Sequence, residues 1–201
     1  MYSSVVLPRQ GVISSDVLAV QGQTMRVWNA SIFGAAGCGS TTLGRALACE
    51  LECQYLDVDD VYWLPTIPPY QTKRPAAERV RMLEVATHWT TSWVLSGSIV
   101  GWGDALVPTF NLVVFLYVPA EVRLARLRAR EWERFGSAIE PNGSMYEQHQ
   151  AFLRSAAGYD TGTSGRTLGT DANWLAQLNC PVMPMTGEPS TYDQVDHILS
   201  L

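Results

Sequence analysis

Short apolar runs alternate along most of this chain with segments of helical periodicity. Runs typical of buried strands occupy residues 27–33, 54–57, 93–96, 112–118 and 182–185. The segments between and after them predict helices over 42–51, 76–89, 121–135, 146–157, 171–178 and 191–201. Strands that alternate with helices favour a parallel sheet with helices on both faces. The pattern therefore predicts an α/β fold with five parallel strands.

The first 24 residues stand apart from this pattern. Residues 1–24 mix Ser, Gln, Gly and short valine pairs without a sustained period, so we predict an N-terminal extension, either a tail or a loose edge element. Residues 25–201 then form one domain, as a chain of this length predicts. Within it, the proline-broken stretch at about 60–91 predicts an insert, and the Gly-, Ser- and Thr-rich stretch at about 136–169 predicts a mobile lid.

Composition and charge exclude several classes of protein. Seven tryptophans and 47% hydrophobic residues exclude a disordered chain. The net charge is −5, and only Lys73 among the 14 basic residues is a lysine, so we expect no specific nucleic-acid partner. The longest apolar run, residues 112–119, is too short to span a bilayer, and the absence of C-x-x-C spacing disfavours zinc. Because residues 1–7 lack the features of a signal peptide, we expect a cytoplasmic protein.

A glycine-rich segment follows the strand predicted over 27–33. It reads Gly34-x-x-x-x-Gly39-Ser40-Thr41 and leads into a helix, which is the context of a phosphate-binding loop. Its glycines let backbone N–H groups turn inward around an anion at the positive end of the helix. Thr41 offers a hydroxyl at the usual Mg²⁺ position, whereas Ser40 stands where the signature has lysine. An ordinary glycine-rich turn is the simpler alternative.

The same glycines also permit a second interpretation, a dinucleotide-binding fingerprint. Asp57 lies 18 residues after Gly39 (57 − 39), near the separation of roughly 20 between the glycines and the ribose-binding acid. However, Thr42 occupies the third glycine position of a G-x-G-x-x-G pattern that begins at Gly37. An NAD(P)-dependent enzyme is therefore the less favoured alternative.

Three features together resemble the P-loop small-molecule kinases: the loop GAAGCGSTTL over 34–43, the acidic run over 57–60, and the arginine-rich helix around 121–131. This family comprises the adenylate-kinase, shikimate-kinase and gluconate-kinase types, often labelled AAA-family ATPases. The resemblance covers about residues 26–201. It implies a three-layer P-loop NTPase fold with a five-stranded parallel sheet, a helical acceptor insert after the second strand and a lid after the fourth. The predicted inserts lie at those places.

The resemblance also implies a nucleotide site for ATP with Mg²⁺. Its members are Gly34, Ala35, Ala36, Gly37, Cys38, Gly39, Ser40, Thr41, Thr42 and Arg126, with Thr41 as the metal ligand. In such kinases, two arginines at this spacing stack on the adenine and hold the transferring phosphates, which assigns stacking to Arg126 and catalysis to Arg130. Guanidinium suits both tasks because it is planar and always charged. A solvated helix face paired with nearby glutamates is the alternative.

The acids at the end of the second strand predict the acceptor site. Asp57 and Asp59 match the D-x-D of shikimate-kinase-like members, and a carboxylate beside the γ-phosphate can orient an alcohol and accept its proton. Asp59 is thus the candidate base, although capping of the next segment is the alternative. Trp63 is a candidate for the acceptor pocket, or else a core residue.

Cations of the insert and lid could compensate for the missing lysine. We assign Lys73 to catalysis and Arg74 to acceptor binding, and either could supply the charge that Ser40 lacks. Arg154 and Arg166 lie in the predicted lid and could close over phosphate, without motif support.

The sequence as a whole predicts an ATP-binding protein that transfers the γ-phosphate to a small acceptor. A nucleotide-binding sensor with little or no turnover is the alternative, because Ser40 leaves binding better supported than catalysis.

Overall fold

Five parallel strands form the centre of the computed structural model, which describes residues 17–20, 23–162, 165–187 and 189–201. Across the sheet their order is β4 (Gln54–Asp57), β5 (Trp93–Ser96), β3 (Asn29–Gly34), β6 (Leu112–Tyr117) and β7 (Val182–Thr186). Because all five run in the same direction, their carboxyl ends lie along one edge, where open α/β sheets bind ligands. The predicted five-stranded parallel sheet is confirmed.

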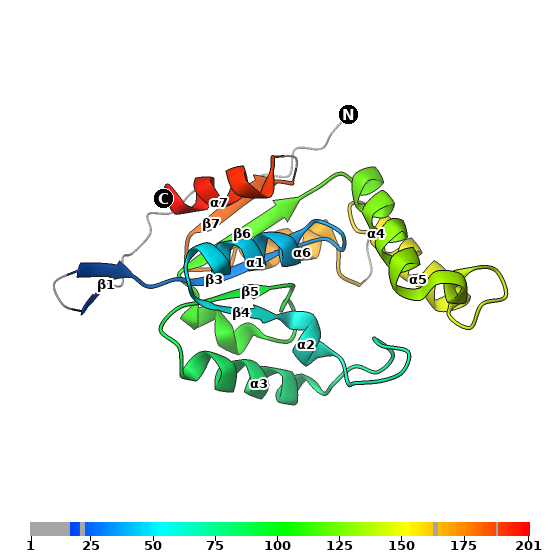
Figure 1. The fold of residues 1–201 in the computed structure, drawn as a ribbon, viewed down its shortest axis with the longest axis horizontal. Helices are drawn as coiled ribbons and strands as arrows, with labels where there is room; N and C mark the ends of the chain where they lie inside the picture. The colour runs from blue at the N-terminus through cyan, green and yellow to red at the C-terminus, as the bar shows by residue number, and fades with distance from the viewer. Residues whose placement is uncertain (1–16, 21–22, 163–164, 188) are drawn as a thin grey trace.

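Helices cover both faces of this sheet (Figure 1). They are α1 (Ser40–Glu50), α2 (Val58–Tyr62), α3 (Ala76–His88), α4 (Ala120–Phe135), α5 (Tyr146–Ala157), α6 (Leu168–Leu175) and α7 (Thr191–Leu199), with the 3₁₀ turns η1 (Asp104–Thr109) and η2 (Gly136–Ile139). On β6, Val114 packs toward α1 and α7, whereas Phe115 packs with Trp174 of α6 and Leu83 of α3. Both faces of the strand are buried, which explains its unbroken apolar sequence.

Local capping explains where the structure departs from the predicted boundaries. Helix α6 begins at Leu168 because Thr167 and Thr170 form a capping box, in which each hydroxyl accepts from the other residue's backbone N–H. The short helix α2 was not predicted; the Asp57 side chain caps it by accepting from the backbone N–H of Asp59.

An antiparallel hairpin precedes the main sheet. It consists of β1 (Val17–Val20) and β2 (Gln23–Arg26), with Val17 paired to Arg26. This pair forms a two-stranded sheet of its own, separate from the five-stranded sheet, and residues 1–16 and 21–22 of the predicted extension lie outside the described residues. The domain boundary at residue 25 stays a prediction. Within the described residues, no helix has both the length and the apolar character needed to cross a bilayer.

The α4–α5 arm projects beyond the edge of the sheet that carries the strand ends, whereas α3 of the predicted insert lies alongside the sheet (Figure 1). The insert contains α2 and α3, and the segment predicted as a lid contains η2 and α5, next to α4 (Figure 1). A buried arginine of α4, Arg123, holds the end of α5: its guanidinium donates to the Ala156 carbonyl at 3.2 Å and to Asp160 at 2.9 Å. It also donates to the Val118 carbonyl at 2.8 Å, so one side chain joins sheet, α4 and α5.

Arg123→Met should lower the free energy of unfolding by about 3–5 kcal/mol, the range for removing one partner of a buried ion pair. The reason is that the Arg123 side chain is 0% exposed and its loss leaves Asp160 and two carbonyls without their donor. Urea unfolding checks this, with the exposed Arg128→Met on the same helix as the control. Equal destabilisation by the two substitutions would contradict the prediction.

Candidate nucleotide and acceptor site

The glycine-rich loop connects the end of β3 to the start of α1 at the centre of the sheet. Gly37 and Gly39 have φ angles of 81° and 99°, in the left-handed region that favours glycine. A Cβ atom at Gly37 would lie 2.8 Å from the carbonyl oxygen of Arg123 and 3.0 Å from a Leu127 side-chain carbon. Glycine at this position therefore serves both the turn and the close approach of α4.

The loop presents unpaired donors at the positive end of α1. Within the described residues, no hydrogen-bond acceptor faces the backbone N–H groups of Gly39, Thr41 and Thr42. The first turn of α1 also contains no acidic side chain that would neutralise its partial positive charge. This donor set, on a loop that only glycines can form, fits a phosphate group.

The acid at the end of β4 contacts the start of α1. The Thr41 hydroxyl donates to Asp57 Oδ2 at 3.3 Å, and the Tyr55 hydroxyl donates to the same oxygen at 2.9 Å. Mg²⁺ is usually bound by one or two protein oxygens together with phosphates and water, so this hydroxyl–carboxylate pair fits that ion. In the described part of the chain, no cluster of three or more His, Cys, Asp or Glu side chains could hold a metal without such phosphates.

The second acid, Asp59, is an exposed residue, although its carboxyl group is partly enclosed by its neighbours. Its Oδ1 accepts from the Trp63 indole N–H at 3.1 Å. Burial raises the pKa of Asp59, and the nearby Asp57 carboxylate raises it further; the Trp63 hydrogen bond and the charges of Arg130 and Arg134 oppose this. A carboxylate with a raised pKa is a stronger base, which suits proton transfer from an alcohol.

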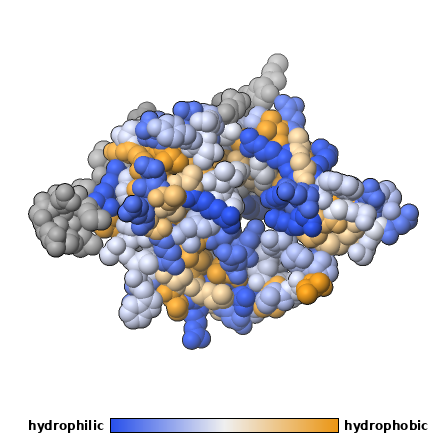
Figure 2. Space-filling model, viewed as in Figure 1, coloured by the Kyte–Doolittle hydropathy of each residue, from blue (hydrophilic) through white to orange (hydrophobic). Residues whose placement is uncertain are grey.

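A cavity of about 590 Å³ opens beside Asp59. Its charged lining consists of Asp59, Lys73, Arg130, Glu131 and Arg134, and its aromatic lining consists of Trp63, Tyr70, Phe135 and Phe152. The space-filling view shows a hollow between the α4–α5 arm and the rest of the molecule, with hydrophilic residues around it (Figure 2). The predicted candidates Asp59, Trp63, Lys73 and Arg130 therefore line one cavity.

The two predicted arginines of α4 both face this edge of the sheet. Arg126 donates to the Cys38 carbonyl at 3.5 Å and to the Gly187 carbonyl at 3.4 Å, so it lies between the glycine-rich loop and the turn after β7. Arg130 lies one turn further along, where its Nε and Nη2 donate to Glu131 at 3.0 and 2.8 Å.

The two cations of the insert differ in their surroundings. Lys73 is exposed, and its ammonium lies 5.8 Å from the centre of the Tyr62 ring. Arg74 donates to the Val61 carbonyl at 3.0 Å and pairs with Glu78 at 3.7 Å, so it holds the insert's own backbone. It also lines a neighbouring cavity of about 600 Å³, which shares Asp59 and Trp63 with the first.

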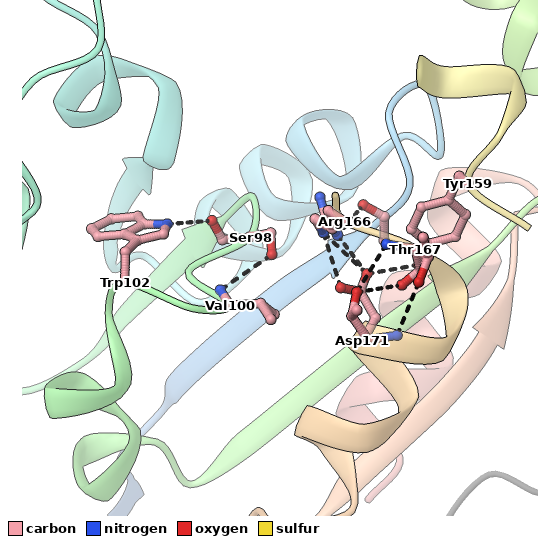
Figure 3. A network of polar contacts seen from close by, with 9 residues as sticks. Ser98, Val100, Trp102, Tyr159, Arg166, Thr167 and Asp171 are labelled. Atoms are coloured by element: carbon pink, nitrogen blue, oxygen red, sulfur yellow. Dashed lines mark hydrogen bonds and ion pairs between the residues drawn. The ribbon is translucent and has the colours of Figure 1, made fainter. Parts of the chain in front are cut away.

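Sequence reasoning missed several residues of this site. Arg134 continues the four-residue spacing of Arg126 and Arg130, a signal that could have found it. Glu131 lines the cavity and pairs with Arg130. Its position directly after Arg130 in the sequence is a signal that could have identified it. Arg166 was named as a lid residue that could close over phosphate, but its pairing with the buried Asp171 (Figure 3) and its contact with Gly34 were not predicted, because no local pattern connects these positions.

Solved structures show that this architecture is the fold of P-loop kinases. The chain is similar to the shikimate kinase of Acinetobacter baumannii in complex with shikimate, at a TM-score of 0.54 and 18% identity over 87% of this chain and 92% of that one. It is also similar to a gluconokinase of Sinorhizobium meliloti 1021, at a TM-score of 0.50 and 12% identity over 86% and 90%. At these identities the likeness shows the fold, and the expected P-loop architecture is confirmed.

Sequence comparison places the chain in a family. It is 41% identical over 172 residues to "Uncharacterized protein YqaC" of Bacillus subtilis (strain 168), covering 85% of this chain and 95% of that protein. The chain belongs to the YqaC family. No model of a known protein family matches it.

The raised pKa of Asp59 yields a prediction about stability. Between the ordinary pKa and the raised one, the folded protein keeps a proton that the unfolded chain has lost, so stability falls as pH rises through that interval. Asp59→Asn removes this penalty and keeps an oxygen for the Trp63 N–H. The variant should therefore be more stable than the wild type at about pH 7, with the difference shrinking toward about pH 3.

Thermal unfolding across that pH range measures the difference. Asp60→Asn, at the exposed neighbouring position, is the control and should change little. A constant difference between Asp59→Asn and the wild type at every pH would contradict the assignment.

Proposed function

We propose that this protein is an ATP-dependent phosphotransferase that moves the γ-phosphate of ATP to a small acceptor. The observation that carries the proposal is the contact of Thr41 with Asp57, because it joins a phosphate-type loop to the strand end that leads to Asp59. The cavity beside Asp59 gives an acceptor room next to that loop. The P-loop kinase fold supports the same class of activity.

The residues divide between the two substrates. The phosphates of ATP bind in the loop from Gly34 to Thr42, at its free N–H groups, and Arg126 stacks on the base between the loop and Gly187. Asp59 orients the acceptor hydroxyl and accepts its proton. Arg130 and Lys73 line the same cavity and offset the charge of the transferring group.

Further residues complete the two sites. Trp63, Asp57 and Arg74 position the acceptor. Thr41, with Asp57 at its hydroxyl, holds Mg²⁺, which when bound neutralises charge on the phosphate oxygens. A cytoplasmic location stays a prediction.

A nucleotide-binding sensor is the second candidate, and Ser40 is the observation that favours it. The position after Gly39 in the phosphate-binding signature is a lysine that reaches the β- and γ-phosphates. By comparison with removal of an oxyanion-hole donor, its loss would slow transfer by roughly 10²–10³-fold while leaving the loop N–H groups in place. A dinucleotide enzyme ranks behind both, because Asp57 is engaged with Thr41 and Tyr55.

A thermal-shift panel separates the three candidates. ATP, ADP, GTP and NAD(P) are tested with and without Mg²⁺, and a ligand at 100 times its Kd should stabilise the protein by about 2.7 kcal/mol. Stabilisation by ATP with Mg²⁺, followed by acceptor-dependent ATP consumption, supports the kinase. ATP binding without product supports the sensor. Stabilisation by NAD(P) that ignores Mg²⁺ would replace both.

Asp59→Asn should lower acceptor-dependent turnover by roughly 10²–10⁴-fold, the usual contribution of a positioned base. Its ATP affinity should stay near that of the wild type, because Asp59 faces the cavity rather than the loop donors. Steady-state kinetics and calorimetric titration measure the two quantities. Full turnover in this variant would remove Asp59 from the mechanism.

Arg126→Ala and Arg130→Ala should differ in what they damage. Loss of Arg126 should weaken ATP binding about 10-fold, since its contacts lie at the loop and at Gly187. Arg130→Ala should mainly lower kcat, because Arg130 lines the cavity of Asp59. Kd and kcat for the two variants check the division; identical profiles would contradict it.

A further inference from the structure

The glycine-rich loop contains no cationic side chain of its own. From Gly34 to Thr42 every residue is Gly, Ala, Cys, Ser or Thr, and Ser40 occupies the lysine position. The Ser40 carbonyl accepts from the Ser96 hydroxyl at 2.9 Å, which fixes the start of α1 to β5. A phosphate-binding loop without lysine has backbone donors but no charge directed at the terminal phosphates.

A cation from a distant part of the chain contacts this loop directly. Nη2 of Arg166 donates to the carbonyl of Gly34, the first loop residue, at 2.7 Å, across 132 positions of sequence. The side chain is 34% exposed, so it is accessible to a ligand from solvent. Its charge also reaches the middle of the loop: burial raises the pKa of the Cys38 thiol, and Arg166 is among the charges that oppose this.

A buried carboxylate fixes the direction of this guanidinium. Asp171 is 0% exposed and accepts from Arg166 Nε at 3.0 Å and from Nη2 at 2.8 Å. The Tyr159 hydroxyl donates to Asp171 Oδ2 at 2.7 Å, and the capping box of Thr167 holds the backbone between Arg166 and α6 (Figure 3). Such anchoring pre-orders a side chain that would otherwise lose considerable rotamer freedom on binding a ligand.

The anchored arginine keeps donors free. Its printed hydrogen bonds use Nε and Nη2, and within the described residues no acceptor faces Nη1. A guanidinium has five N–H donors in a planar fork, a geometry that suits phosphate oxygens. Arg74, by contrast, donates hydrogen bonds to the Val61 and Trp63 carbonyls.

We propose that Arg166 binds the terminal phosphates of the nucleotide and supplies the charge that Ser40 does not. The proposal rests on the proposed nucleotide binding and deepens it: the ligand class is a nucleoside di- or triphosphate, recognised at its terminal phosphates. Because Arg166 lies just before α6 and after the lid helix α5, the phosphate-binding charge comes from the far end of the lid segment rather than from α1.

The test moves the charge from one position to the other. The variants are Arg166→Met, Ser40→Lys and the double variant, and exposed Arg128→Met is the control. Calorimetric titration with ATP, ADP and adenosine measures affinity. Arg166→Met should weaken ATP and ADP binding roughly 10- to 100-fold, as expected for hydrogen bonds to a charged group, and leave adenosine binding unchanged. The double variant should recover most of the loss.

A second double variant separates phosphate binding from a structural role. Arg166→Met leaves Asp171 buried without its cation, so the fold itself could suffer. Arg166→Met with Asp171→Asn removes both charges and should restore thermal stability without restoring ATP affinity. If it restores ATP affinity, or if Ser40→Lys rescues nothing, Arg166 acts through the fold and the proposal is overturned.

Failure of this proposal differs from failure of the proposed function. If the wild type binds ATP and Arg166→Met binds it equally well, only the proposed role of Arg166 is contradicted. If the wild type binds neither ATP nor ADP, the nucleotide-binding function falls, and the role of Arg166 falls with it.

Discussion

The carboxylate of Asp57 is the point on which the arrangement of the site depends. It accepts hydrogen bonds from the Thr41 hydroxyl of α1, from the Tyr55 hydroxyl of β4 and from the backbone N–H of Asp59 at the start of α2. Three elements around the glycine-rich loop therefore share one carboxylate. Since hydrogen bonds to an ionised acceptor are stronger than neutral ones, this anion fixes where Asp59 stands relative to the loop.

The same geometry makes Asp59 a weaker acid than an ordinary aspartic acid. It brings a second carboxylate near Asp57 and beside Trp63, where partial desolvation and like charge both raise the pKa of Asp59. Arg130 and Arg134 oppose that shift without removing it. A carboxyl group that has a raised pKa and lines a cavity is a candidate for a functional site.

The sequence predicted the sheet well because its signals are local. The sequence placed β4 and β5 at their observed bounds, since each is a short strand-like segment between non-strand segments, apolar in β5 and mixed in β4. The loop and the α4 arginines could be named as candidates for the same reason: their spacing lies within one motif or one helix face. Helix α2 and the early start of α6 were missed, because side-chain caps decided them. The contact of Arg166 with Gly34 could not be found, because it depends on how the chain returns after α5.

That return path has a physical consequence for the proposed phosphate site. A lysine at position 40 would belong to α1. Its charge would stay at the loop even if the segment between α5 and α6 moved. Arg166 instead reaches the loop only while α6 and the residues before it hold their place, through Asp171, Tyr159 and the capping box. Any displacement of that segment would withdraw a cation from the Gly34 carbonyl and expose the buried Asp171. Under the proposed role of Arg166, phosphate binding and packing of the lid's far end are therefore coupled, since one guanidinium serves both.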